Sequence, residues 1–120
     1  MPLKVFNESR GTIVADQVEI ADTFLKRLVG LMGKRSLVPG EGLFLPQVTS
    51  IHTFFMRFPI DVVFLDGQGV VVRIEKALPP FRIAMGGRNA RATLELPVTP
   101  TDATAIAPGD RLILRTVNSL

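Results

Sequence analysis

The chain has 120 residues, of which 47% are hydrophobic and 21% charged; this composition is typical of a globular domain and excludes an intrinsically disordered chain. The absence of cysteine excludes disulfides, thiolate catalysis and cysteine-bound metals. The formal net charge is only +3 and acidic residues are interspersed with basic ones, so nucleic-acid binding is not expected.

The same composition sets the expected domain organisation and location. We expect residues 1–120 to form a single domain, with its core between about residues 3 and 116. No stretch approaches the ~20 apolar residues of a membrane span, and the N-terminal segment has no apolar region of signal-peptide length. We therefore expect a cytoplasmic protein without a membrane span.

The first third of the chain predicts a hairpin followed by a helix. Leu3–Asn7 and Thr12–Ile20 alternate apolar and polar residues, and the turn residues between them favour a β-hairpin. Apolar residues then recur at helical spacing from Ala21 to Met32, with Asp22 placed to cap the N-terminus. We expect one amphipathic helix here, ending at or after Gly30.

The remaining chain predicts strands joined by turns. Proline separates two apolar runs at Pro59, because it cannot donate a hydrogen bond to a sheet. Asp66-Gly67-Gln68-Gly69 is the clearest hairpin signal. The expected strands are Leu43–Leu45, Ile51–Phe58, Ile60–Leu65, Val70–Ile74, Ala92–Leu96 and Arg111–Thr116, with an irregular stretch at Ala84–Ala90 and a short helical turn at Thr99–Asp102.

These elements together predict the fold class. We expect an α+β domain, mainly antiparallel β, with a compact barrel-like or sandwich-like architecture. One amphipathic helix lies in its N-terminal half and a short helical turn near its C-terminus.

The segment IHTFFMRFPIDVVFLD, residues 51–66, holds the main candidates for chemistry. Asp61 interrupts two apolar runs, so it should lie within or at the rim of a sheet, where an unpaired charge is costly. Its candidate partners are Arg57, His52, Arg82 and the backbone amides at the Pro59 bend. A structural role is favoured over a role in a functional site.

Strand periodicity places His52 on one face together with Phe54, Met56 and Phe58. A histidine among large apolar side chains is more often a hydrogen-bonded core or rim residue than a catalytic one. A single histidine without cysteine does not make a metal site, and no phosphate-binding, dinucleotide-binding or hydrolase motif is complete. We expect no metal and no cofactor.

A second candidate region is the segment from Phe81 to Arg91, which contains Arg82 and Met85. Its glycines expose backbone N–H groups and its three arginines could bind an anion. A solvated loop is the simpler interpretation.

Several motifs in this order resemble a known family: Gly30-Leu31-Met32, the segment 51–66, Val70–Val72, Leu94-Glu95-Leu96 and Pro108-Gly109-Asp110. The chain resembles the family catalogued as domain of unknown function 192. The resemblance covers about Leu3 to Thr116 and implies a compact, mostly β domain with no established activity. The polar or motif residues that it carries over, as a shared pocket or structural network, are His52, Met56, Arg57, Asp61 and Glu95.

These observations leave three hypotheses for function. The first is a small non-catalytic binding or accessory domain for an unknown small molecule or protein, with a pocket lined by Met56, Arg57, Asp61, Arg82 and Met85. The second is an enzyme acting on a small anionic substrate, with Asp61 or Glu95 as the acid–base group and His52 as a proton shuttle. The third is a protein-interaction module or homodimer that pairs through a sheet edge.

Overall fold

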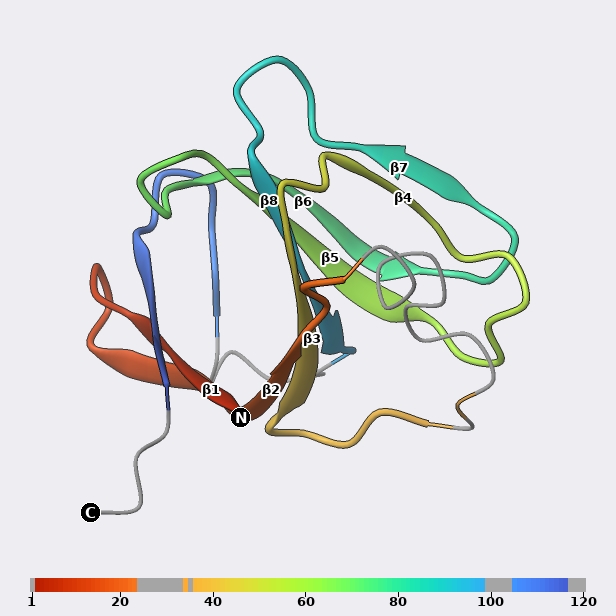
Figure 1. Ribbon diagram of the computed structural model, residues 1–120, viewed down its shortest axis with the longest axis horizontal. Helices are drawn as coiled ribbons and strands as arrows, with labels where there is room; N and C mark the ends of the chain where they lie inside the picture. Colours follow the sequence, from red (N-terminus) through yellow and green to blue (C-terminus); the bar gives the residue numbers. More distant parts are fainter. Residues whose placement is uncertain (1, 24–33, 35, 99–104, 117–120) are drawn as a thin grey trace.

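The computed structural model describes residues 2–23, 34, 36–98 and 105–116 (Figure 1). Within these ranges the chain forms nine β-strands: β1 (Leu3–Asn7), β2 (Thr12–Ile20), β3 (Glu41–Pro46), β4 (Ser50–His52), β5 (Ile60–Leu65), β6 (Val71–Leu78), β7 (Ile83–Met85), β8 (Ala92–Pro97) and β9 (Leu112–Thr116).

The expected α+β class is wrong, because the described residues form an all-β fold that contains no helix. Most of the predicted amphipathic helix, residues 24–32, and all of the predicted helical turn, Thr99–Asp102, lie outside the described residues. The pairing of the described strands is mainly antiparallel, as expected, and the one exception is β2 with β3, which pair in parallel. Local periodicity gives no signal for the relative direction of two strands that are separated by twenty residues of intervening chain.

Seven strands form one mixed sheet in the order β6-β5-β8-β3-β2-β1-β9, and β4 pairs only with β7 in a second, small sheet. The hairpins β1–β2 and β5–β6 confirm the two strongest turn predictions. In the second turn, Asp66 Oδ1 accepts hydrogen bonds from the amides of Gln68 at 2.8 Å and Val70 at 2.9 Å. Because the Asp66 side chain closes its own turn, the local sequence was sufficient to predict this hairpin.

The large sheet curls until its two edge strands meet at one end. An isolated bridge joins Val70 to Arg111. Next to it, the amide of Leu112 donates to the carbonyl of Gly69, and the amide of Val71 donates to the carbonyl of Asp110, both at 2.8 Å. Gly69 permits this approach, because its φ is +83° and a Cβ atom there would lie 2.5 Å from the Leu112 carbonyl oxygen.

The curled sheet separates two apolar layers. The concave layer gathers buried side chains from most of the large sheet, including Val5 of β1, Val18 of β2, Leu94 of β8 and Leu112 of β9. The convex layer lies between the other side of β3, β5 and β8 and the small sheet: Leu43, Val62, Ile51 and Ala84 are among its members. In Figure 1 the β4–β7 pair accordingly runs beside the curled sheet, at the periphery of the molecule.

The small sheet differs from the sequence-based expectation at both of its strands. The predicted strand Ile51–Phe58 ends at His52, and residues 53–58 form turns and bends. The stretch expected to be irregular, Ala84–Ala90, begins within β7. As a result Met56 is 5% exposed and belongs to the convex layer, whereas His52 is exposed, so they do not share the face that strict alternation predicted.

Candidate functional site

Thr53 is a buried anchor that joins the loop after β4 to the loop before β7. Its Oγ1 donates to the carbonyl of Pro79 at 2.7 Å and accepts from the amide of Arg82 at 2.9 Å. Its own amide donates to the Arg82 carbonyl at 2.8 Å, and its carbonyl accepts from the amide of Phe81 at 3.1 Å. Four bonds converging on one side chain and its backbone fix the two loops against each other. Sequence reasoning missed Thr53 because these partners are 26 or more residues away.

The two loops that Thr53 joins each hold a phenylalanine in a left-handed backbone conformation. The φ angles are +66° at Phe55 and +63° at Phe81. A bulky side chain pays a steric cost in this region, on the order of 1–3 kcal/mol, and such outliers persist only where surrounding contacts enforce them. Yet both side chains point largely into solvent, with exposed fractions of 70% and 62%. The strained backbone at these two positions is therefore not compensated by burial of either ring in the core.

Exposed apolar side chains cluster in and beside the small sheet, and Phe55 is the exposed neighbour of Phe54 in the chain. The His52 ring stacks on Phe54 at 5.2 Å between centroids, and Phe54 lies 6.3 Å from Phe81. Ile83 pairs with His52 across the small sheet and shares its outward side with Met85, two residues on. Ile83 is 64% exposed and Met85 65%. We call this the β4–β7 surface; its members are His52, Phe54, Phe55, Phe81, Ile83 and Met85.

The segments that carry the β4–β7 surface contain basic residues but no acidic ones. Residues 50–60 and 79–91 contain no aspartate or glutamate. The rest of the chain holds ten basic and eleven acidic residues, which nearly cancel. The positive charge of the protein is thus concentrated in these two segments, whose arginines are all exposed: Arg57, Arg82, Arg88 and Arg91.

Beneath this surface lies a buried carboxyl group. Glu95 pairs with Leu43 of β3 and with Val62 of β5, so it shares their face of the sheet and points into the convex layer. It is 4% exposed, and it makes no hydrogen bond or ion pair with any described residue. Burial without a partner penalises the charged form and raises the pKa of Glu95 to about 7.

The other buried carboxylate of the central strands, Asp61, lies on the opposite face. It pairs with Leu96, whose side chain belongs to the concave layer. Its Oδ2 accepts from Lys76 Nζ at 2.9 Å and its Oδ1 accepts from the Ala77 amide at 2.8 Å. The partner is therefore Lys76 with a backbone amide of β6, and not Arg57, His52, Arg82 or the Pro59 bend.

Asp61 and Lys76 border a cavity at one end of the curled sheet, which Val14, Ile106 and other apolar residues also line. Its volume is about 60 Å³, whereas pockets for metabolite-sized ligands span about 300–1,000 Å³. Met56, Arg57, Arg82 and Met85 do not line it. The five residues of the expected small-molecule pocket therefore do not share this cavity.

The structure distributes the predicted site residues over three places. His52, Arg82 and Met85 lie on or beside the β4–β7 surface, and exposed Arg57 follows Phe55 in the same basic segment. Met56 and Glu95 belong to the layer beneath it, and Asp61 faces the other side of the sheet. His52 accepts a hydrogen bond from the Phe54 amide through Nδ1. A proton relay joining His52, Asp61 and Glu95 on one substrate has no support from this arrangement.

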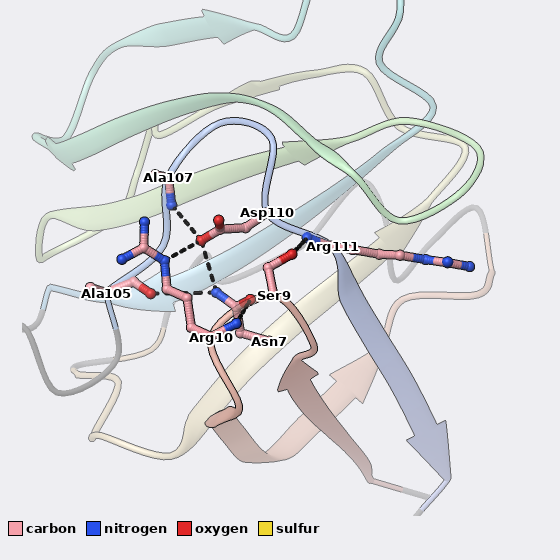
Figure 2. Close-up of polar contacts among 7 residues, drawn as sticks. All are labelled: Asn7, Ser9, Arg10, Ala105, Ala107, Asp110 and Arg111. Carbon is pink, nitrogen blue, oxygen red and sulfur yellow. Dashed lines mark hydrogen bonds and ion pairs between the residues drawn. The ribbon is translucent and has the colours of Figure 1, made fainter.

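A second polar cluster ties the start of the chain to its end (Figure 2). Asp110 Oδ2 accepts from Asn7 Nδ2 at 2.9 Å, from Arg10 Nε at 2.6 Å and from the Ala107 amide at 3.0 Å. The Asn7 hydrogen bond is the largest of the effects that hold the pKa of Asp110 below its usual value. Because three donors of the chain itself converge on Asp110 Oδ2, we assign this cluster a structural role in fixing the turn before β9.

Two further properties bear on the class of site. No group of histidine and acidic side chains that could hold a metal ion occurs among residues 2–23, 34, 36–98 and 105–116. Over the same part of the chain, no helix is long and apolar enough to cross a membrane.

Fold and site together define a small all-β domain with a curled, seven-stranded sheet and an exposed, basic, aromatic surface. The model of the family catalogued as domain of unknown function 192, described as "Uncharacterized ACR", matches residues 5–114. The chain belongs to this family.

Relatives of similar sequence support that membership, and two solved structures share the fold. The chain is similar to a UPF0127 protein of Pyrococcus abyssi, at 37% identity over 90% of this chain and 94% of the relative, and to one of Thermococcus sibiricus, at 37% identity over 90% and 72%. It shares its fold with a protein of unknown function from Novosphingobium aromaticivorans, with a TM-score of 0.78 and 22% identity over 94% of this chain and 84% of that one. A Sinorhizobium meliloti protein gives a TM-score of 0.79 at 24% identity, over 93% and 91%.

Proposed function

We propose that the protein is a non-catalytic binding module that docks onto a partner through the β4–β7 surface. The observation that carries the proposal is the exposure of five large apolar side chains in two segments, residues 50–60 and 79–91, whose charged residues are all arginines. Large exposed apolar patches on a soluble domain mark sites of interaction, because leaving them in water is unfavourable. Their exposed fractions run from 36% at Phe54 to 70% at Phe55.

Strain in the two loops supports the same function. A sequence selected for stability alone would place glycine or asparagine at the left-handed positions 55 and 81, because these residues adopt φ > 0 at little cost. Phenylalanine there is explained by a role for its side chain outside the folded chain. The network around Thr53 supplies the contacts that enforce this conformation.

The charge of these segments argues against self-association through the same surface. A symmetric dimer would place Arg57 and Arg82 of one copy near the same arginines of the other, and no acidic residue in these segments would compensate them. The surface is suited to an apolar partner that carries negative charge.

Site-specific photo-crosslinking in the native organism tests the docking function. A benzophenone amino acid replaces Phe55, and in a matched control it replaces Ile13, an apolar side chain of β2 that is 51% exposed. We expect a discrete crosslinked product from position 55 and none from position 13. Equal products at both positions, or no product at position 55, would show that this surface is not a docking site.

A second variant keeps that experiment independent of folding. Phe81→Asn removes an apolar side chain but suits the left-handed backbone, so the domain should stay folded. It should abolish the crosslink formed from position 55 if the two rings contact one partner. An unchanged yield would contradict docking through the joined loops.

A further inference from the structure

We propose that the partner of the β4–β7 surface is a lipid bilayer with anionic headgroups, on which the protein lies peripherally. This inference rests on the docking function proposed above and names the chemistry of its partner. It follows from the shape of the surface, from the position of its charges and from the conformation of its two most exposed rings.

The shape of the surface favours a bilayer over a partner that inserts into a pocket. Phe55 and Phe81, the most exposed of its aromatic rings, are carried by loops and project outward. No member of the surface lines the cavity beside Asp61 and Lys76, the one beside Gly69 or the one beside Phe6. A bilayer needs no complementary cavity, because projecting apolar side chains enter the boundary between headgroups and acyl chains and gain from leaving water.

The charges lie where an anionic bilayer would meet them. Arg82 directly follows Phe81 and its guanidinium group donates to the Phe81 carbonyl at 3.4 Å, while exposed Arg57 is two residues from Phe55 in the chain. Guanidinium groups bind phosphate through paired N–H donors. Anionic lipids attract each basic residue near their surface, and the lack of acidic residues in these segments leaves that attraction unopposed.

The left-handed backbone at Phe55 and Phe81 is also consistent with membrane binding. Left in water, Phe55 and Phe81 combine an unfavourable backbone conformation with unfavourable exposure. Burial in the bilayer removes the second cost for both rings at once. An acidic, apolar protein surface would also complement the charge, and it is therefore the alternative outcome in the test below.

Vesicle binding measured by tryptophan fluorescence tests the inference. The chain has no tryptophan or tyrosine, so Phe55→Trp introduces a single reporter, and Ile13→Trp is the matched control on β2. The probes are vesicles of phosphatidylcholine alone and of phosphatidylcholine mixed with phosphatidylglycerol. We expect a blue shift at position 55 with the anionic vesicles, a much smaller one with phosphatidylcholine, and none at position 13.

Sedimentation with the same vesicles measures the contribution of each feature. The double variant Phe55→Asn/Phe81→Asn should weaken binding to anionic vesicles by at least about tenfold, while its thermal unfolding midpoint is unchanged or higher. Arg57→Gln/Arg82→Gln should weaken that binding and reduce its salt dependence. Ile13→Thr should bind as the original chain does.

The outcomes separate the two proposals. No blue shift and no sedimentation with anionic vesicles would overturn the lipid inference. If a crosslink from position 55 to a protein persisted in that case, the docking function would stand with a protein as its partner. Equal binding to both vesicle types would show that the arginines do not contribute, and it would overturn the proposal that the bilayer must be anionic.

Discussion

Asp61 and Glu95 lie on neighbouring strands and point to opposite faces of the same sheet. The register causes this, because Asp61 is opposite Leu96 while Glu95 is opposite Val62. A shift of one position along a strand moves a side chain to the other face. One carboxylate therefore reaches the exposed end of Lys76 and a β6 amide, and the other is enclosed among apolar side chains. The two acids should respond differently to substitution and to pH.

Glu95 should make the protein less stable as the pH rises. Its pKa is raised to about 7 in the folded state, so between about pH 4.5 and 7 the folded chain holds a proton that the unfolded chain has lost. Stability is then highest below this window and falls through it, by on the order of 3 kcal/mol. Chemical denaturation at a series of pH values measures the decline.

Glu95→Gln should remove most of that decline, because the amide stays neutral in both states. It should therefore be more stable than the original chain at pH 8. Glu19→Gln, a change at an exposed acid of β2, should leave the decline intact. A pH profile that is the same for the Glu95 variant and the original chain would disprove the assignment of the decline to this residue.

Asp61 should matter more for stability than its ion-pair partner. The register between β5 and β6 shifts between Ile60 and Val62, so Asp61 lies opposite the irregularity at Lys76 and Ala77. Its carboxylate accepts a hydrogen bond from the Lys76 side chain and one from the Ala77 amide. Asp61→Ala should lower the free energy of unfolding by roughly 1–3 kcal/mol. Lys76→Ala should cost less than about 1 kcal/mol, because 64% of that side chain is exposed to solvent.

Asp61→Asn refines this comparison in thermal or urea unfolding. Its amide oxygen still accepts from the Ala77 amide, so we expect a loss between those of the two alanine variants. If Lys76→Ala proved as damaging as Asp61→Ala, the ion pair and not the backbone amide would be the main contribution.

Gly69 should be indispensable to the meeting of the two edge strands. Alanine at this position would need a left-handed φ of +83° and would place a Cβ atom 2.5 Å from a backbone oxygen of Leu112. We expect Gly69→Ala to cost more than about 2 kcal/mol. Gly11→Ala is the matched control: its φ is +68° but nothing lies within 4 Å, so it should cost only about 1 kcal/mol.

Hydrogen exchange locates the damage in the Gly69 variant. The amides of Val71 and Leu112, which bond across the meeting edges, should exchange faster than in the original chain. Similar losses of stability for the two glycine variants would mean that backbone strain, and not the contact with Leu112, dominates.

The sequence predicted those parts of the fold whose causes are local. The β5–β6 hairpin follows from Asp66 and its neighbours, which close their own turn, and the buried strand β3 follows from a short apolar run. The parallel pairing of β2 with β3 has no such signal. The three-residue strands β4 and β7 are too short for alternation to reveal, so the period assumed for residues 51–58 failed after His52.

Sequence reasoning predicted only part of the candidate site, because the rest depends on contacts between segments that are distant in the chain. His52, Arg82 and Met85 were singled out by type and neighbourhood, but their gathering on one surface depends on the pairing of β4 with β7. Thr53 and the left-handed phenylalanines carried no signal, since their roles come from contacts with distant segments. Glu95 was marked by a family motif, yet its isolation from charged partners required the register of three strands.

The first and last described strands are neighbours, since β1 lies between β2 and β9. On the ribosome, β1 can form a hairpin with β2 early, but its other edge stays unpaired until β9 has been synthesised and has left the exit tunnel. Sheets that join distant parts of a chain fold in milliseconds to seconds, more slowly than sheets built from successive hairpins. The nascent chain therefore carries an open β1 edge until β9 has emerged, and this edge is exposed to aggregation over that interval.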